Sequence, residues 1–237
     1  MKSRYRRVLL KISGELFGNE KENLDVEFLS RISREISYCI KELQTQIAIV
    51  VGGGNIVRGK TIEKMGFDRI SADYMGMLAT AINSMALQNA LEKEGIETRI
   101  VSAIEIKAIG EPFIRRKVLE HLDKNRVVIF ACGTGNPLFT TDTAAALRAG
   151  EIKADLLIKG TKVDGVYDKD PKIHKDAKKF DFIDLKTMLN LELQVMDQTA
   201  IALCRENKIP ILVFNITREG SLSKALAGEK IGTFVEI

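Results

Sequence analysis

The chain has 237 residues, of which 45% are hydrophobic and 29% charged, the ordinary usage of a globular protein with enough apolar surface for a core. Its 36 basic residues exceed the 32 acidic ones by 4, an excess that suits a protein handling anionic ligands but does not demand nucleic acid. Tryptophan is absent and aromatic residues make up 6%, so a base-stacking platform, and with it a nucleic-acid partner, is not expected.

The first half of the chain alternates short β-branched runs with longer helical patterns. Asp25 can cap a helix whose apolar residues, from Leu29 to Leu43, recur at steps of three and four. A long helix is predicted over residues 71–94, and another is predicted to start near Pro112, because proline is favoured in a first turn. The strands predicted in this half are 7–12, 47–51, 98–102 and 127–131.

The long helix carries a row of bulky apolar residues on one face, which is interpreted as core or as a subunit interface. These residues are Met75, Leu78, Ile82 and Met85.

The second half continues the alternation, with a helix opening at Thr141 and two more near Asp184 and Asp197. The segment 164–181 is rich in Asp, Lys, Gly and Pro and predicts an exposed loop or short hairpin. Strands separated by helices imply an α/β protein with a mainly parallel central sheet and helices on both faces. No break in composition divides the chain, so one domain over 1–237 is expected. The strands predicted in this half are 156–158, 211–214 and 232–235.

The sequence has no sign of membrane insertion or export. No apolar run approaches the roughly 20 residues that cross a bilayer, and the apolar stretch after the basic N-terminus ends at Lys11, too short for a signal peptide. Cys39, Cys132 and Cys204 are far apart and lack metal-ligand spacing, so they predict reduced thiols in a cytoplasmic protein.

Four loops that follow predicted strands are rich in Gly, Thr, Asn and Asp. Ligands of open α/β sheets bind beyond the carboxyl ends of the strands, and glycines let backbone N–H groups approach phosphate oxygens. Four such loops on one side of a sheet therefore predict a site for a phosphate ligand. The loops are 11–14, 52–55, 133–137 and 159–165.

The segment 54–61 also matches the P-loop pattern GxxxxGK[ST], in which Lys60 would hold phosphates and Thr61 would bind Mg²⁺. Two features argue against a P-loop. Gly66 interrupts the following segment within two turns, and no apolar strand ends in an Asp that could serve as a second metal ligand.

Five motifs, in order along the chain, resemble those of the bacterial UMP kinases, which share the amino acid kinase fold (a three-layer sandwich) and are unrelated to P-loop nucleotide kinases. The stretch from Gly133 to Asp142, together with Asp73 in its helix, is what points to UMP. The motifs are Lys11-Ile-Ser-Gly-Glu, Gly52-Gly-Gly-Asn-Ile-Val-Arg58-Gly, Asp73-Tyr-Met-Gly-Met-Leu-Ala-Thr, Gly133-Thr-Gly-Asn-Pro-Leu-Phe-Thr-Thr-Asp142 and Thr161-Lys-Val-Asp-Gly-Val-Tyr-Asp-Lys-Asp-Pro171.

The resemblance implies transfer of the γ-phosphoryl group of ATP, with Mg²⁺, to UMP, giving UDP and ADP in pyrimidine nucleotide biosynthesis. It implies an acceptor-binding part over roughly 1–150 and an ATP-binding part over roughly 151–237. It implies Lys11 as the catalytic ammonium between donor and acceptor, Asp142 as the carboxylate that orients it, and no metal ligand from the protein. Lys159 and Asp197 are further candidates near the phosphates, with no role assigned.

The remaining site residues follow from the same motifs. The implied ATP-binding residues are Lys11, Ile12, Ser13, Gly14, Gly54, Arg58, Thr161, Tyr167 and Asp170. The implied UMP-binding residues are Gly53, Asp73, Thr134, Gly135, Asn136, Pro137, Leu138, Phe139, Thr140 and Thr141, with Asp73 accepting hydrogen bonds from the ribose hydroxyls.

The family resemblance also implies a homohexamer assembled from dimers. The stretch 17–25 lacks the Gly-Phe-Gly loop that the family associates with GTP regulation, so activation by GTP is not implied. Three alternatives remain open from the residues: a kinase of the same fold acting on a carboxylate or carbamate, a P-loop NTPase using Lys60, and a nucleotide-sensing module without catalysis.

Overall fold

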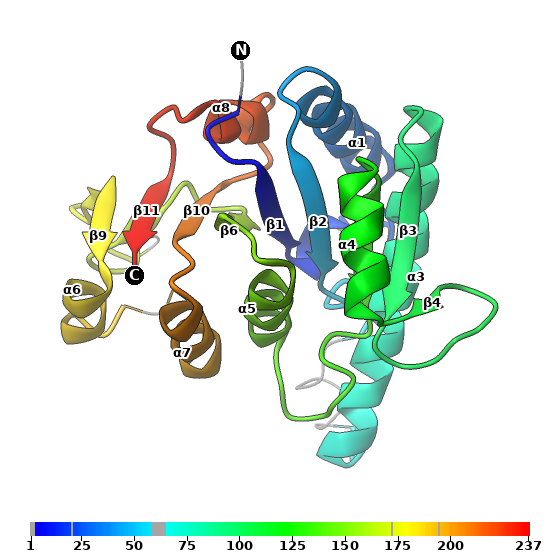
Figure 1. Cartoon of the computed structure of the whole chain (residues 1–237). Coiled ribbons are helices and arrows are strands. Elements are labelled where there is room, and N and C mark those ends of the chain that lie inside the picture. The colour runs from blue at the N-terminus through cyan, green and yellow to red at the C-terminus, as the bar shows by residue number, and fades with distance from the viewer. Residues whose placement is uncertain (1–2, 20, 58–64, 172, 194) are drawn as a thin grey trace.

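The computed structural model of the chain describes residues 3–19, 21–57, 65–171, 173–193 and 195–237. At its centre lies a nine-stranded sheet with the order β4-β3-β5-β2-β1-β6-β10-β11-β9 (Figure 1). Neighbouring strands are parallel except β10 and β11, so the prediction of a mainly parallel sheet is confirmed. The strands are β1 Arg7–Ile12, β2 Gln46–Val51, β3 Thr98–Ser102, β4 Glu111–Pro112, β5 Val127–Ala131, β6 Leu156–Thr161, β9 Phe182–Asp184, β10 Ile211–Asn215 and β11 Thr233–Glu236.

Helices cover both faces of this sheet and make three layers (Figure 1). One face packs against α1, α3 and α8, and the other packs against α4, α5, α6 and α7. A short 3-10 helix, η1, follows β1, and β7 with β8 forms a separate antiparallel hairpin, as the segment 164–181 predicts. The helices are α1 Val26–Lys41, η1 Gly14–Leu16, α3 Arg69–Lys93, α4 Arg115–Asp123, α5 Thr141–Ile152, α6 Leu185–Asn190, α7 Gln198–Asn207 and α8 Ser221–Ala227, and the hairpin strands are β7 Val166–Tyr167 and β8 Lys179–Phe180.

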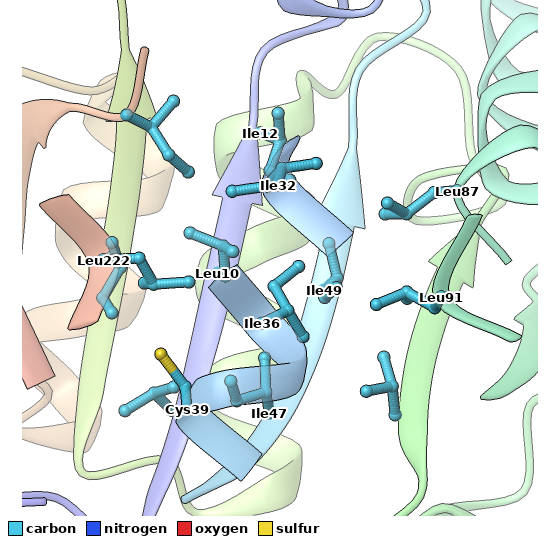
Figure 2. Close-up of a cluster of buried hydrophobic side chains, with 14 of the residues drawn as sticks. Leu10, Ile12, Ile32, Ile36, Cys39, Ile47, Ile49, Leu87, Leu91 and Leu222 are labelled. Carbon is cyan, nitrogen blue, oxygen red and sulfur yellow. The ribbon is translucent and has the colours of Figure 1, made fainter. Parts of the chain in front are cut away.

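The alternation of side chains along β1 divides the core into two clusters. Leu10 and Ile12 pack with α1, α3 and α8, where Figure 2 shows Ile32, Ile36 and Leu222 around them. Leu9 points to the opposite face and packs with the alanine-rich side of α5. Lys11 has the same parity as Leu9, so β1 presents its lysine to the α5 face.

The helix predicted after Asp25 is confirmed. The Asp25 carboxylate accepts a hydrogen bond from the Phe28 N–H at 2.9 Å, and the apolar positions of α1 are buried against the sheet. Among the described helices, none has the length and hydropathy that crossing a membrane requires.

One prediction of local structure is wrong, and a second is narrowed. Pro112 does not open a helix: it pairs with Ser102 as the last residue of β4, and α4 begins three residues later at Arg115. The face of α3 that carries Leu78, Ile82 and Met85 is predicted above to be core or a subunit interface. It is not part of the core of this chain, because these side chains are 49%, 47% and 46% exposed, so an interface stays as the prediction. The buried side of the helix carries Leu87 and Leu91 together with small and polar residues.

Candidate active site

Two lysines and one carboxylate meet where β1, β6 and α5 come together. The parallel register pairs Lys11 with Lys159, which places both side chains on the α5 face of the sheet. Asp142, in the first turn of α5, lies between them, with its Oδ1 2.9 Å from Lys11 Nζ and its Oδ2 2.6 Å from Lys159 Nζ. Lys11 also donates to Ser13 Oγ at 3.1 Å, and Lys159 donates to the Val195 carbonyl at 2.6 Å.

In this cluster, burial and the neighbouring charges shift each pKa in opposite directions. Burial lowers the pKa of Lys11, although the neighbouring Asp142 carboxylate opposes the shift. Burial by itself would raise the pKa of Asp142, but the two ammonium groups outweigh it and hold the pKa below its ordinary value. Two ammonium groups against one carboxylate leave an excess positive charge in a poorly solvated place, which a phosphate would neutralise.

The glycines of the two phosphate-type loops differ in what surrounds them. A Cβ on Gly14 would lie 2.3 Å from the Gly54 nitrogen, and one on Gly52 would lie 2.6 Å from the Gly14 nitrogen, so these glycines let the two loops touch. A Cβ on Gly53 would clash with the Gly76 carbonyl of α3 at 2.7 Å. Gly54 alone of these has no described atom within 4 Å of such a Cβ, so packing against the described residues does not require a glycine there. Ile12 lies wholly in the core, so only its backbone can reach a ligand.

A cavity of about 470 Å³ lies between the start of α3, the loop 52–55 (the glycine loop) and the loop after β5 (the acceptor loop). Seven of the predicted UMP-binding residues line it, whereas Gly135, Pro137 and Leu138 do not. Neutral hydroxyl and amide groups dominate the part contributed by the loop after β5. The seven are Gly53, Asp73, Thr134, Asn136, Phe139, Thr140 and Thr141.

Asp73 and the loop after β5 are held together directly. The Leu138 N–H donates to Asp73 Oδ2 at 2.8 Å, and the Arg69 guanidinium donates to the same carboxylate at 3.0 Å. A carboxylate can accept about four hydrogen bonds, so Asp73 keeps capacity for a ligand hydroxyl. At the end of the loop, Thr140 caps α5 and donates to Asp197, which also accepts from the Thr143 hydroxyl and caps α7.

A second, larger cavity of about 700 Å³ lies on the other side of the glycine loop. Gly54 lines both cavities, and Lys162 contributes to the larger one. The predicted ATP residues Thr161 and Tyr167 lie close to Lys162 in the chain, and each donates a hydrogen bond to a residue two or three positions away. Thr161 Oγ1 donates to the Val163 carbonyl at 2.8 Å, and the Tyr167 hydroxyl donates to Asp164 at 2.7 Å.

Some predicted residues cannot be located in this site. Arg58, and the P-loop residues Lys60 and Thr61, lie outside the described residues. Asp170 lies in the turn after β7, where its backbone carbonyl accepts from the Ile173 and His174 N–H groups.

Sequence reasoning assigned no role to Lys159, yet its side chain holds one of the two oxygens of Asp142. The sequence does show that Lys11 and Lys159 each lie near the carboxyl end of a predicted strand. Only the folded sheet, with its parallel register, shows that the two strands are neighbours and that the two lysines pair. Thr80 was missed as well. It lines the smaller cavity from α3, and its hydroxyl accepts from the Cys132 N–H at 2.7 Å.

The described residues do not themselves offer a metal centre, because they include no cluster of three or more His, Cys, Asp or Glu side chains. Asp142, the carboxylate nearest the lysines, has ammonium groups at both oxygens. Mg²⁺ prefers several oxygen ligands, usually waters and phosphates with one or two carboxylates, so a metal here would need ligands from a bound nucleotide.

Comparisons with known proteins agree with this geometry. A family model described as the amino acid kinase family matches residues 6–215. A UMP kinase from Bacillus anthracis is 37% identical, with a TM-score of 0.94 over 98% of this chain and 96% of that one. A UMP kinase from Ureaplasma parvum is 38% identical, with a TM-score of 0.93 over 99% and 100%. A uridylate kinase from Archaeoglobus fulgidus is 30% identical, with a TM-score of 0.75 over 96% and 99%.

Replacing Asp142 with Asn is expected to lower the free energy of unfolding at neutral pH by about 3–5 kcal/mol, because two poorly solvated ammonium groups lose their counter-charge. The depressed pKa of Asp142 means that its carboxylate stabilises the fold above the ordinary carboxyl pKa. This stabilisation is lost as the pH falls through the depressed value, so the difference between wild type and variant should shrink on acidification.

Urea unfolding of both proteins, from neutral pH down to about pH 3, measures this difference. Asp123→Asn is the matched control, since Asp123 pairs with Arg7 at 2.9 Å but is 57% exposed, and a loss of under about 1 kcal/mol is expected. A difference for Asp142→Asn that stays constant or grows at low pH would contradict the assignment.

Proposed function

The chain belongs to the amino acid kinase family, and on that premise we propose that it is a UMP kinase, which transfers the γ-phosphoryl group of ATP to UMP and releases UDP and ADP. One observation carries the assignment to UMP. UMP kinases that are 37–38% identical match nearly the whole chain. The chain also has a cavity lined by Asp73 and by the loop after β5, the two segments whose motifs point to UMP as the acceptor.

Phosphoryl transfer between two nucleotides requires positioning and charge balance more than covalent chemistry by the protein. We assign the smaller cavity to UMP, with Asp73 accepting from the ribose and the Thr and Asn groups of the loop facing uracil and phosphate. Lys11 stabilises the charge that develops on the transferring group, and Asp142 keeps its ammonium oriented. No general base is needed, because the acceptor phosphate oxygen is already anionic.

The donor triphosphate is assigned to the backbone between η1 and the glycine loop. Ser13, Gly14 and Gly54 lie there, and Gly54 lines both cavities. The ATP-binding part then follows from β6 onward, with Thr161, Tyr167 and Asp170 toward the nucleoside. Lys159 belongs to the same centre, since it fixes the second oxygen of Asp142.

Mg²⁺ enters this scheme with ATP, held by phosphate oxygens. When bound, it neutralises phosphate charge and orients the chain of phosphates. The three unpaired, buried cysteines support the expectation of a reducing, cytoplasmic setting, in which UMP phosphorylation serves pyrimidine nucleotide synthesis.

The substrate assignment is tested by measuring ADP release with UMP, CMP, AMP, acetylglutamate and carbamate as acceptors. UMP is expected to give the highest kcat/KM, because the similar proteins that cover nearly the whole chain are UMP kinases and because acetylglutamate and carbamate lack the ribose that Asp73 suits. Preference for acetylglutamate or carbamate would overturn the assignment in favour of a carboxylate or carbamate kinase. Binding of UMP in calorimetry without turnover would instead indicate a sensing module.

Lys11→Ala is expected to lower kcat by at least about 100-fold, the effect typical of losing a group that stabilises developing charge. Lys60→Ala is the control that separates this mechanism from a P-loop, and only a minor change is expected. Steady-state kinetics with ATP and UMP decide between them. A near-normal kcat in Lys11→Ala, or loss of turnover in Lys60→Ala alone, would contradict the proposal.

A homohexamer built from dimers is proposed for the assembly, and the exposed face of α3 supports a contact between chains. Five bulky apolar side chains on this face are 43–49% exposed and follow one another along the helix. A contiguous apolar stripe on a surface is typical of an interface, whereas single exposed apolar residues are not. The stripe consists of Ile70, Tyr74, Leu78, Ile82 and Met85.

Ile82→Glu is therefore expected to reduce the mass of the assembly in light scattering, because it puts a charge in the middle of the stripe. Val26→Glu is the matched control, since Val26 is 69% exposed but lies on α1, away from the stripe. An unchanged mass for Ile82→Glu, or the same loss for Val26→Glu, would remove α3 from the interface.

A further inference from the structure

The buried side of α3 carries polar residues where a helix facing a sheet would ordinarily place apolar ones. Thr80 is 5% exposed and Asn83 is fully buried. Buried polar groups destabilise a fold unless they find hydrogen-bond partners. Most of the side-chain bonds of Thr80 and Asn83 reach segments that lead into the nucleotide site, which gives α3 a role beyond packing.

Thr80 is bonded to the start of the acceptor loop. Its hydroxyl donates to the Met77 carbonyl within α3 at 2.6 Å and accepts from the Cys132 N–H at 2.7 Å. Cys132 has a φ of +61°, a left-handed conformation that is uncommon outside glycine, and it directly precedes Gly133. The Thr80 hydroxyl therefore fixes the residue at which the chain turns from β5 into the loop that lines the smaller cavity.

Asn83 is bonded to the glycine loop. Its Nδ2 donates to the Gly52 carbonyl and to Asn55 Oδ1, both at 2.7 Å. Asn55 returns a hydrogen bond to Asn83 Oδ1 at 3.0 Å and donates to the Asn23 carbonyl at 2.7 Å. The two ends of the Gly52–Asn55 loop are thus held by one side chain, and the glycines between them are those that line the cavities.

We infer that Thr80 and Asn83 are positioning residues for the transfer reaction: Thr80 holds the acceptor loop and Asn83 holds the glycine loop, both from one rigid helix. The inference rests on the proposed function, because it needs UMP and ATP as the ligands of these loops. Neither side chain is required to touch a reacting atom. Each acts through the backbone that it holds.

Thr80→Val removes the hydroxyl while keeping the shape of the side chain, and Thr80→Ser keeps the hydroxyl. The valine variant leaves the Cys132 N–H without its partner, so the loop start relaxes and KM for UMP should rise about tenfold, while KM for ATP changes less than about twofold. The serine variant should keep both KM values near wild type. A merely structural role would lower the active fraction, and so the apparent kcat, without moving either KM.

Asn83→Asp keeps the size of the side chain but removes both donated bonds, including the one to the Gly52 carbonyl. Because Gly53 and Gly54 lie between the bonded ends of that loop, KM should rise for both nucleotides, by about fivefold or more. The two residues therefore predict different patterns. If Thr80→Val does not fold, Asn83→Asp still tests the inference at the glycine loop, and Thr80→Ala tests it at the acceptor loop.

Three outcomes overturn the inference. The first is unchanged KM values in Asn83→Asp or in folded Thr80→Val. The second is an equal rise of KM for both nucleotides in Thr80→Val, and the third is a KM for UMP in Thr80→Ser as high as in Thr80→Val. Failure of the proposed function is separate, because wild type would then show no UMP turnover. Calorimetric titration of UMP into wild type, Thr80→Val and Thr80→Ser gives the acceptor affinity directly, and an unchanged affinity in the valine variant again overturns the inference.

Discussion

The structure of the site depends on one buried ion cluster. The parallel register of β1 and β6 forces Lys11 and Lys159 onto the same face, where two like charges would repel each other in a poorly solvated place. Asp142 reduces this repulsion because its carboxylate lies between the two lysines, with one oxygen next to each ammonium group. The junction of β1, β6 and the start of α5 is therefore fixed by charge as well as by packing. The excess positive charge of this cluster is the feature on which the proposed role in phosphoryl transfer rests.

The four glycines of the loops 11–14 and 52–55 lie in different surroundings. Gly14 and Gly52 are required by the contact between their loops, since a side chain at either would overlap backbone atoms. Gly53 is likewise required by the closeness of α3. A Cβ on Gly54 would meet no described atom within 4 Å, and Gly54 lines both cavities. Close packing therefore accounts for the first three glycines, whereas the fourth is placed at the cavities.

The sequence predicted those helices and strands whose apolar residues recur with a clear local period. The buried strands and α1 follow from β-branched runs and from apolar steps of three and four. Pro112 was assigned wrongly because its pairing with Ser102 in β4 outweighs its preference for a first helical turn. Motif matching found Asp73 and most of the cavity lining. It did not find Thr80 and gave Lys159 no role, because their partners are distant in sequence and only the folded sheet brings them close.

Helix α3 shows that a row of bulky apolar residues does not by itself tell a core face from an exposed one. Residues 73, 80 and 83 fall within about 80° of one another around a helix, and the stripe through Ile82 falls on the far side. Near the candidate site the inner side carries small and polar residues, because it lies close to Gly53 and bonds to the Gly52 carbonyl and the Cys132 N–H. Further along the helix the same side carries Leu87 and Leu91, which pack in the core. The bulky apolar residues of the stripe are exposed, and this exposure is the observation on which the proposed contact between chains rests.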